Sequence, residues 1–357
     1  MSSSIHMNPV FTARLVNGPF GDPGLYIHLR WEGRGLLFDL GNNDGFPTAE
    51  LLRVTHVFVS HCHIDHFIGF DRLLRLFLAR DKKLYVFGPP GIIDCVEGKL
   101  RGYTWNLVDN YGFIIEVAEV SPDRIQRAVF PAANAFQAET LPSRPLVDGI
   151  VLDEPAFVVR VAHLDHRIYS LGFALEEKSH LNIDKDLLNR LGVPTGPWLS
   201  ELKHALRRDK ADDFIVTATW RKKDGEEHRW DFRLGDVRDR LVKETRGQKI
   251  AYVVDTLYSP DNAARIATLA READIFFCES PFLHDDEEQA TKRHHLTTRQ
   301  AGLLAQAAAA RKLVVFHFSP RYAGQAERMY QEAQAAFRGE TLVDNSGTRS
   351  AAPSFSV

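Results

Sequence analysis

The sequence predicts an α/β fold in which helices pack on a sheet, and two features support this prediction. The chain opens with short apolar runs separated by Gly, Pro and Asn turns, as in "FTARLV", "LYIHLRW" and "RGLLFDLG", which is typical of antiparallel strands. From "HVFVS" onward, strand-like runs alternate with helical stretches, as expected for helices that cover a sheet. A polar and charged region, residues 176–247, interrupts this alternation.

The alternating part of the chain contains a series of predicted strands and helices. The stretch "FDRLLRLFLAR" has apolar residues at helical spacing, and "KLYVFGPPG" follows it as a strand and turn. Farther along, the strand "KIAYVVDT" and the helix "SPDNAARIATLAREA" precede the strand "DIFFCES". The alanine-rich helix "TTRQAGLLAQAAAARK" then leads to a last strand, "LVVFHFSPRY".

Composition limits the class of protein. The chain has 357 residues, of which 44% are hydrophobic, enough for one large domain at residues 10–340 with flexible tails at 1–9 and 341–357. The longest apolar runs are strand-sized, so no membrane contact is expected. The three cysteines are scattered and odd in number, which argues against a disulfide framework and favours a reducing cytoplasm. A net charge of -3 gives no global attraction to nucleic acid.

Residues 176–247 are predicted to form an arm inserted in the domain. They contain "LGVPTGPWLSELKHALRRDK" and a predicted strand, "DFIVTATW". Few apolar positions there look buried, so we expect a segment that projects from the domain and has no hydrophobic core of its own. Between Leu199 and Lys223, seven basic residues face four acidic ones, a local charge of +3. Such a cluster can hold RNA phosphates, although a charged run is more often a solvated face.

The stretch "VSHCHIDHFIG" carries the strongest chemical signal. His61 and His63 follow an apolar strand and lie two positions apart, so their side chains point the same way and can reach one metal ion. Asp65 and His66 lie at the turn into the next helix and face a second position. Imidazole and carboxylate are the usual ligands of zinc and related divalent ions. The spacing therefore predicts two adjacent metal ions at one strand end.

The spacing H-x-H-x-D-H after a short strand resembles the metallo-β-lactamase superfamily of binuclear metal hydrolases. This resemblance implies an αβ/βα sandwich with the metals at one edge. It also implies that Asp39 in "LLFDLG" supports the metal loop, that Asp255 in "AYVVDT" bridges the ions, and that His317 in "VVFHFSPRY" is the last ligand. The third ligand is His163 or His166, and the run "LDHRIYSLGF" matches the family pattern with His166.

The resemblance implies two zinc ions, with other divalent metals also compatible. The seven expected ligands are His61, His63, Asp65, His66, His166, Asp255 and His317.

Within this superfamily, three further segments resemble ribonuclease Z, whose members remove 3′ trailers from tRNA precursors. "CESPF" followed by "HHLTTRQAG" implies that Glu279 and His295 take part in catalysis, with His295 delivering the proton; the adjacent His294 is the alternative. Asp65 would orient the attacking water. "HFSPRY" implies that Ser319 and Arg321 bind phosphate, with a surface salt bridge as the alternative for Arg321. "GPWLSELKHAL" resembles the family's tRNA-gripping arm.

Other functions stay open at this point. The chain has "VDT" where ribonuclease Z proteins have Gly-Asp-Thr, and it lacks their early "GTG" turn. A hydrolase of a small phosphodiester, sulfate ester or other ester is therefore the second hypothesis, and a catalytically silent binding protein is the third. Precursor tRNA is the expected partner under the first hypothesis, and a homodimer is one assembly to be tested.

Overall fold

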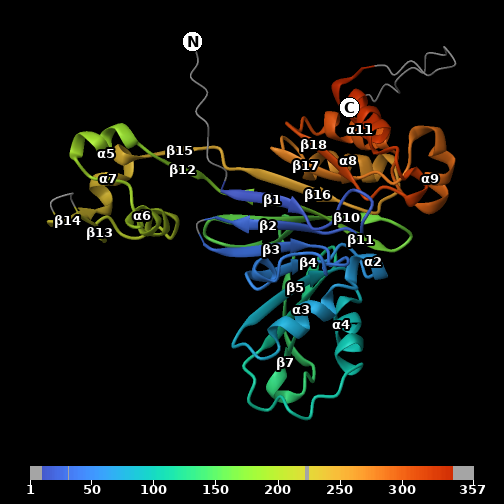
Figure 1. Ribbon diagram of the computed structural model, residues 1–357, viewed down its shortest axis with the longest axis horizontal. Coiled ribbons are helices and arrows are strands. Elements are labelled where there is room, and N and C mark those ends of the chain that lie inside the picture. Colours follow the sequence, from blue (N-terminus) through green and yellow to red (C-terminus); the bar gives the residue numbers. More distant parts are fainter. Residues whose placement is uncertain (1–9, 31, 222–224, 341–357) are drawn as a thin grey trace. The chain divides into compact units, whose positions relative to one another are not determined.

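The computed structural model describes residues 10–30, 32–221 and 225–340, so the two expected tails lie outside the described residues. The chain divides into two compact units (Figure 1). Unit 1 is built from the segments 1–151, 159–175 and 249–357, and unit 2 from 152–158 and 176–248. The segment expected to form an arm, 176–247, thus falls in unit 2.

The first sheet of unit 1 has eight strands in sequence order. The first three pair antiparallel, as the opening turns predict. The next pairings, from the third strand to the sixth, are parallel, and the last strands are antiparallel again. The strands are β1 (Phe11–Leu15), β2 (Leu25–Leu29), β3 (Arg34–Phe38), β4 (Val54–Phe58), β5 (Lys83–Gly88), β6 (Ile114–Val120), β7 (Arg124–Pro131) and β8 (Glu139–Pro145).

The second sheet has six strands in the order β18-β17-β16-β11-β10-β9. Its three C-terminal strands are parallel, because a helical stretch connects each of them to the next. The strands are β9 (Ile150–Asp153), β10 (Phe157–Asp165), β11 (Tyr169–Glu177), β16 (Lys249–Val253), β17 (Ile275–Glu279) and β18 (Leu313–Phe316).

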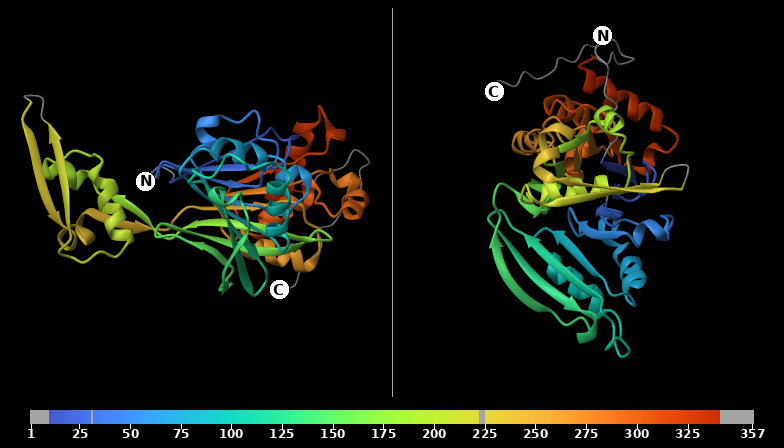
Figure 2. Two further views of the ribbon diagram at one scale, coloured as in Figure 1. Left: turned by 90° about the horizontal axis from the view of Figure 1, so that it is seen from below. Right: turned by 90° about the vertical axis from the view of Figure 1, so that its left-hand side faces the viewer.

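Aromatic side chains join the two sheets face to face. Phe173 of the second sheet contacts Phe38 and Phe58 of the first, with ring centroids 5.6 and 5.7 Å apart. Tyr252 lies 6.0 Å from Phe38. Helices cover the outer face of each sheet, where their apolar residues complete two separate hydrophobic clusters (Figure 2). Unit 1 is therefore the expected αβ/βα sandwich.

The helices beside the first sheet are α1 (Thr48–Leu51), α2 (Ile64–Phe67), α3 (Phe70–Phe77) and α4 (Ile92–Arg101), with the short η1 (Ala132–Asn134). Those beside the second sheet are α8 (Pro260–Leu269), α9 (Glu287–Arg293), α10 (Thr298–Ala307) and α11 (Ala326–Arg338), with η2 (His284–Asp286) and η3 (Pro320–Tyr322). Across the described part of the chain, every helix is too short or too polar to span a bilayer.

Unit 2 has a hydrophobic core of its own. The expectation that the projecting segment has no core is therefore wrong. Trp198, Leu202 and Ala205 lie on one face of a helix and are buried with Val216 and Phe232 from a hairpin. Each helix or strand supplies at most three of these buried apolar residues among many charged ones, and the core becomes evident only when they pack together. The elements are β12 (His180–Ile183), α5 (Lys185–Leu191), α6 (Trp198–Arg207), β13 (Ile215–Arg221), β14 (Glu227–Arg233), α7 (Leu234–Leu241) and β15 (Val242–Thr245).

Candidate metal centre

The histidine-rich segment links the end of β4 to the start of α2. The strand is buried up to Val59, and the chain then turns through residues 60–63 before the helix begins at Ile64. His61 and His66 are fully buried, whereas His63 is exposed. The turn thus places some of the histidines inside the sandwich and others at its rim.

Predicted ligands from distant parts of the sequence come together in unit 1. Their nitrogen and oxygen atoms form three overlapping groups, in each of which all atoms lie within 4.8 Å of one another. The groups are His61, His63, His166 and Asp255; Asp65, His66 and His317; and Asp255, Glu279 and His317. All seven predicted ligands belong to at least one group, and His166 is present where His163 is not.

Asp255 lies at the centre of these groups. Its Oδ2 atom is 3.5 Å from His61 Nε2 and 3.4 Å from the Nε2 atoms of both His66 and His166. Its Oδ1 atom is 3.1 Å from His317 Nδ1. Burial would raise the pKa of Asp255, but the neighbouring histidines outweigh burial and hold this pKa well below its usual value. One carboxylate therefore reaches imidazoles on both sides of the site.

The outward-facing nitrogens of three histidines have hydrogen-bond partners. The Nδ1 atom of His61 lies 3.0 Å from Ser60 Oγ, and that of His66 lies 3.0 Å from Asp39 Oδ2. His166 Nδ1 donates to the carbonyl oxygen of His294 at 2.7 Å. Such contacts fix the ring orientation and leave Nε2 free as a metal ligand.

The atoms that face the centre have no such partners. The Nε2 atoms of His61 and His66, Asp255 Oδ1 and His317 Nδ1 are all buried without a hydrogen bond. Buried polar atoms rarely stay unpaired in proteins, because the lost hydration costs free energy. The donor set and these unpaired atoms fit divalent metal ions, and imidazole with carboxylate suits zinc.

Asp39 is a buried anchor beneath the histidine segment. It follows β3 directly and accepts hydrogen bonds from the Ser60 amide (2.7 Å), the Ser60 hydroxyl (2.9 Å) and the Tyr252 hydroxyl (3.0 Å). Burial, followed by the charge of Asp39, raises the pKa of Tyr252 well above its usual value, so the phenol remains a donor. The family resemblance assigns Asp39 this supporting position.

Strand ends at the site have an unusual backbone conformation. Asp39, Asp255 and His317 lie just beyond β3, β16 and β18, and each has a positive φ of 60°, 43° and 62° respectively. Non-glycine residues rarely adopt this conformation, although Asp and His do so more often than most. Such strain is often concentrated at functional sites, where surrounding contacts hold it in place. These turns direct the Asp255 and His317 side chains into the metal groups, and the Asp39 side chain toward His66 beneath them.

Glu279 and His295 form a pair beside the metal groups. His295 Nδ1 lies 2.9 Å from Glu279 Oε2, and the carboxylate also accepts hydrogen bonds from the Thr256 and Leu296 amides. Burial would lower the pKa of His295, but the charge and hydrogen bond of Glu279 and the charge of Asp255 together outweigh burial and raise this pKa. The ring thus favours the protonated form at the edge of the cluster, with Nδ1 3.8 Å from Asp255 Oδ1.

The alternative histidines have other contacts. The His163 ring nitrogen Nε2 lies 3.2 Å from the Val120 carbonyl, outside all three groups. His294 contributes its backbone carbonyl to His166 and has a φ of 58°. Burial lowers the pKa of the His294 ring, the opposite direction to that of His295.

The predicted phosphate-binding residues follow His317: Ser319 directly precedes η3, and Arg321 lies in η3. Arg321 lies 3.7 Å from Asp286 Oδ2 and its guanidinium is 5.4 Å from the centre of the Phe282 ring. The surface salt bridge considered for Arg321 is therefore present. The Ser319 amide donates to the Pro281 carbonyl, which fixes the turn. Phosphate binding by Ser319 and Arg321 stays a prediction.

Asn262, at the start of α8, is a buried residue that the sequence analysis missed. Its side-chain amide donates to Thr256 Oγ1 at 2.9 Å and to the Asp165 carbonyl at 3.2 Å, and its oxygen accepts from the Asp165 amide. It therefore connects the loop that carries His166 to the loop that carries Asp255. Its position in "SPDN" resembles an ordinary helix start, so no local signal distinguishes it.

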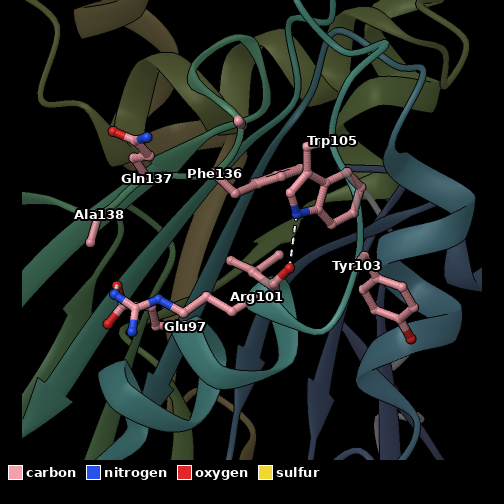
Figure 3. A pocket seen from close by; sticks show the side chains of 9 residues that line it. Glu97, Arg101, Tyr103, Trp105, Phe136, Gln137 and Ala138 are labelled. Atoms are coloured by element: carbon pink, nitrogen blue, oxygen red, sulfur yellow. Dashed lines mark hydrogen bonds and ion pairs between the residues drawn. The ribbon is translucent and has the colours of Figure 1, made fainter.

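A pocket of about 510 Å³ lies elsewhere in unit 1, near the C-terminal end of α4 (Figure 3). The Trp105 indole in its wall donates to the Leu100 carbonyl at 2.8 Å. Its only charged lining residues, Glu97 and Arg101, pair with each other at 2.6 Å. The pocket shares no residue with the metal groups.

No family model matches the sequence. Several curated relatives, which all carry the same name, match nearly the whole chain. Ribonuclease Z of Deinococcus radiodurans is 29% identical over 343 residues, which cover 94% of this chain and 98% of the relative. Ribonuclease Z of Lactobacillus helveticus is 30% identical over 319 residues, covering 87% of this chain and 85% of that one.

Solved structures agree on the fold. The metallo-β-lactamase fold protein YhfI from Bacillus subtilis matches with a TM-score of 0.52 at 14% identity, covering 92% of this chain and 93% of its own. The short form of human tRNase Z matches with a TM-score of 0.50 at 18% identity, covering 87% and 93%. Full-length similarity to curated relatives, on a sandwich of the metallo-β-lactamase type, shows that this chain belongs to the ribonuclease Z family.

Proposed function

We propose that this protein is a zinc-dependent endoribonuclease that hydrolyses a phosphodiester bond to remove 3′ trailers from tRNA precursors. The observation that carries the proposal is the position of Asp255, whose two carboxylate oxygens reach His61 and His166 on one side and His317 on the other. A site of this kind suits two adjacent metal ions. The curated relatives of similar length are named ribonuclease Z.

The proposed ligands divide into two sets around a shared carboxylate. When bound, two zinc ions supply Lewis acidity that activates water and stabilises charge on the phosphodiester oxygens. Other divalent metals with a preference for nitrogen and oxygen ligands are compatible with the same atoms. His61, His63 and His166 would hold one ion, Asp65, His66 and His317 would hold the other, and Asp255 would be shared by both sets.

In this proposal, Asp65 orients the attacking water and His295 donates a proton to the leaving group. Burial would raise the pKa of Asp65, but His317 and His66 together outweigh burial and the pKa falls to about 2. The carboxylate is therefore ionised at neutral pH and can accept a hydrogen bond from the attacking water. His295, protonated with the help of Glu279, donates a proton to the departing 3′ oxygen.

RNA binding is assigned to exposed basic residues of unit 2. Arg208, Lys210 and Arg221 are exposed there, and their charges are available to phosphates. Arg207 is not, because its buried guanidinium pairs with Glu177 at 3.0 Å. We therefore leave Arg207 out of the proposed RNA-binding surface; Lys222 and Lys223 of the same basic cluster lie outside the described residues.

Two further features belong to the proposal. We place the enzyme in the cytoplasm, in keeping with three cysteines that are all free. We propose a homodimer as its assembly, and sedimentation analysis at several protein concentrations tests this assignment.

The decisive experiment supplies the purified, zinc-loaded protein with a 3′-extended tRNA precursor. We expect cleavage between the tRNA body and the trailer, with loss of activity after chelation and recovery with zinc. Mature tRNA and a small chromogenic phosphodiester serve as comparison substrates. Turnover of the small phosphodiester without any precursor cleavage would replace the proposal with the small-substrate hydrolase. Absence of both activities in metal-loaded protein would leave a silent binding protein.

A further inference from the structure

Two side chains hold the turn between β10 and β11 to the end of α9. His166 Nδ1 donates to the His294 carbonyl at 2.7 Å, and Arg167 Nη2 donates to the Lys292 carbonyl at 3.1 Å. The bonded residues are 128 and 125 positions apart in the sequence, and all of them belong to unit 1. His295 follows at once, so both hydrogen bonds hold the backbone that leads into the proposed proton donor.

The Lys292 carbonyl needs a partner from outside the helix. In a continuing α-helix it would accept from the amide four positions later, but that amide, of Leu296, donates to Glu279 Oε1 instead. The helix stops where His294 adopts a positive φ of 58°. The last carbonyls of a helix lack partners within it, and basic side chains are among the groups that satisfy them. The Arg167 guanidinium does so here.

The backbone of Arg167 is held by its own turn, although its side chain is exposed. The Arg167 amide donates to Asp165 Oδ1 at 2.8 Å, and its φ of 61° is positive. The Asp165 carbonyl accepts from the Leu257 amide at 2.9 Å and from the Asn262 side chain at 3.2 Å. Surrounding contacts of this kind keep a non-glycine residue at positive φ. The guanidinium is therefore attached to a fixed part of the site.

Glu279 holds His295 from the other side. Its carboxylate lies 2.9 Å from His295 Nδ1 and accepts from the Leu296 amide at 3.3 Å. The centres of the His295 and His166 rings are 5.0 Å apart. The ring is thus fixed by Glu279, and the backbone before it by His166 and Arg167. Because His166 is also a proposed metal ligand, Arg167 is the contact that can be removed without removing a ligand.

We propose that Arg167 is a positioning residue, which holds the Lys292 carbonyl and so places His295 for proton donation to the leaving group. This inference rests on the proposed function. When the bond between phosphorus and the 3′ oxygen breaks, the electron pair goes to that oxygen, which takes its proton from His295. A displacement of about 1 Å can slow a reaction by about 100-fold. We therefore expect Arg167→Ala to slow precursor cleavage by about 10- to 100-fold.

The experiment compares two leaving groups at saturating substrate, with the zinc content of each preparation measured. Precursor tRNA releases an alkoxide, which needs a proton, whereas bis(4-nitrophenyl) phosphate releases nitrophenolate, which leaves without one. Arg167→Ala should keep its zinc and its kcat on the nitrophenyl ester, while its kcat on the precursor falls. Arg167→Lys keeps a cationic donor and should recover most of the precursor rate. Arg293→Ala, which removes another exposed arginine from the end of α9, should leave both rates unchanged.

A double variant tests whether Arg167 acts through His295. Residues that act as a unit have effects that are not additive, so Arg167→Ala should add little to the loss caused by His295→Ala. Two losses that multiply would overturn the proposal. Zinc loss in Arg167→Ala, or equal slowing of both substrates, would overturn it as well, because the effect would then pass through His166 and the metal.

Hydrogen–deuterium exchange of the metal-free protein gives a measurement that does not depend on activity. Arg167→Ala should exchange faster than the wild type in the segment 290–296, where the amides of His294 and His295 donate to the carbonyls of Thr291 and Ala290. Unchanged exchange there would overturn the proposal. Zinc-loaded wild type that cleaves no precursor would refute the proposed function instead, and the exchange data would still decide whether Arg167 holds the end of α9.

Discussion

Asp39 and His66 are 27 positions apart in the sequence, yet Asp39 Oδ2 lies 3.0 Å from His66 Nδ1 in the buried base of the site. Burial would lower the pKa of His66, but Asp255 and then Asp39 outweigh it, so that the pKa rises to about 10 in the protein without metal. The same contact turns Nε2 toward the metal groups. Asp39 therefore sets both the orientation and the basicity of one proposed ligand.

Asp39→Asn should keep the size of this side chain but remove its charge. We expect zinc affinity to fall by about 10- to 100-fold, as for other carboxylates that orient a metal-binding histidine. Competition with a chromophoric chelator measures the change. Asp44→Asn, at an exposed position on the same loop, is the matched control. Unchanged affinity in Asp39→Asn would show that Asp39 supports the loop without influencing the metal.

His63→Ala tests the metal requirement with little risk to the fold, because His63 is the exposed member of its group. We expect bound zinc to fall below two ions per chain and hydrolysis to disappear with it. Metal analysis and a precursor cleavage assay on the same preparation measure both effects. His204→Ala, at an exposed position on α6, should change neither. Full activity of the wild type after exhaustive chelation would contradict a metal-dependent reaction.

The sequence predicts the metal groups well for a physical reason. His61, His63, Asp65 and His66 are close in the chain, and their spacing alone restricts how they can point. Distant members such as Asp255 could be assigned only through family resemblance, because a lone aspartate at a strand end is usually a turn residue. The structure brings these residues together in one cluster.

Other features depend on long-range packing that no local pattern records. Asn262 joins two loops by hydrogen bonds to the nearby Thr256 and to Asp165, which is 97 positions away in the sequence. The core of unit 2 collects its apolar residues from several short elements. In the sequence, Arg207 resembles the other charged residues of a basic run. In the structure, its side chain is buried and pairs with Glu177. In each case the partner, and not the residue type, determines the role.

His295→Ala should keep its zinc but slow precursor cleavage by about two to four orders of magnitude, as expected for loss of a general acid. Single-turnover kinetics and metal analysis separate the two effects. His294→Asn is the control, because asparagine tolerates the positive φ and keeps the carbonyl that accepts from His166. A large rate loss in His294→Asn with none in His295→Ala would reverse the assignment.

The buried His56 ring, which lies away from the metal groups, should make the stability of the protein depend on pH. Its ring is buried on β4, 4.7 Å from Tyr85, and burial, followed by the nearby Arg34, lowers its pKa to about 3. The unfolded chain takes up this proton near pH 6.5, whereas the folded protein does not until about pH 3. Stability should therefore fall as the pH drops through this window, by up to about 1.4 kcal/mol per pH unit from this group.

His56→Phe removes that titration and keeps an aromatic ring in the stack. The difference in unfolding free energy between variant and wild type should shift in favour of the variant as the pH falls from 7 to 4. Urea denaturation at several pH values, with metal-free protein in both cases, measures this difference. A difference that is constant with pH would mean that His56 titrates normally in the folded protein.

Arg207 and Arg208 are neighbours in sequence but should respond oppositely to substitution. The Arg207 side chain is 8% exposed and pairs with the fully buried Glu177, which also lies 3.2 Å from His180 Nδ1. Arg207→Ala leaves a buried carboxylate with one partner fewer, so unit 2 should lose about 3–5 kcal/mol of stability. Thermal unfolding of the full chain measures this loss. An unchanged transition would show that Glu177 is satisfied without Arg207.

Arg208→Glu should leave stability unchanged, because Arg208 is exposed, and should weaken binding of precursor tRNA. When one phosphate contact is lost, binding of the RNA releases about one counterion fewer. The slope of log affinity against log salt concentration should therefore flatten by about 0.7–0.9. Turnover of a small chromogenic phosphodiester should not change, since the substitution is in unit 2 and every proposed ligand is in unit 1. Arg101→Glu, which reverses an exposed charge on unit 1, controls for net charge. If both reversals reduce RNA affinity equally, the effect is one of overall charge, and unit 2 has no special part in holding RNA.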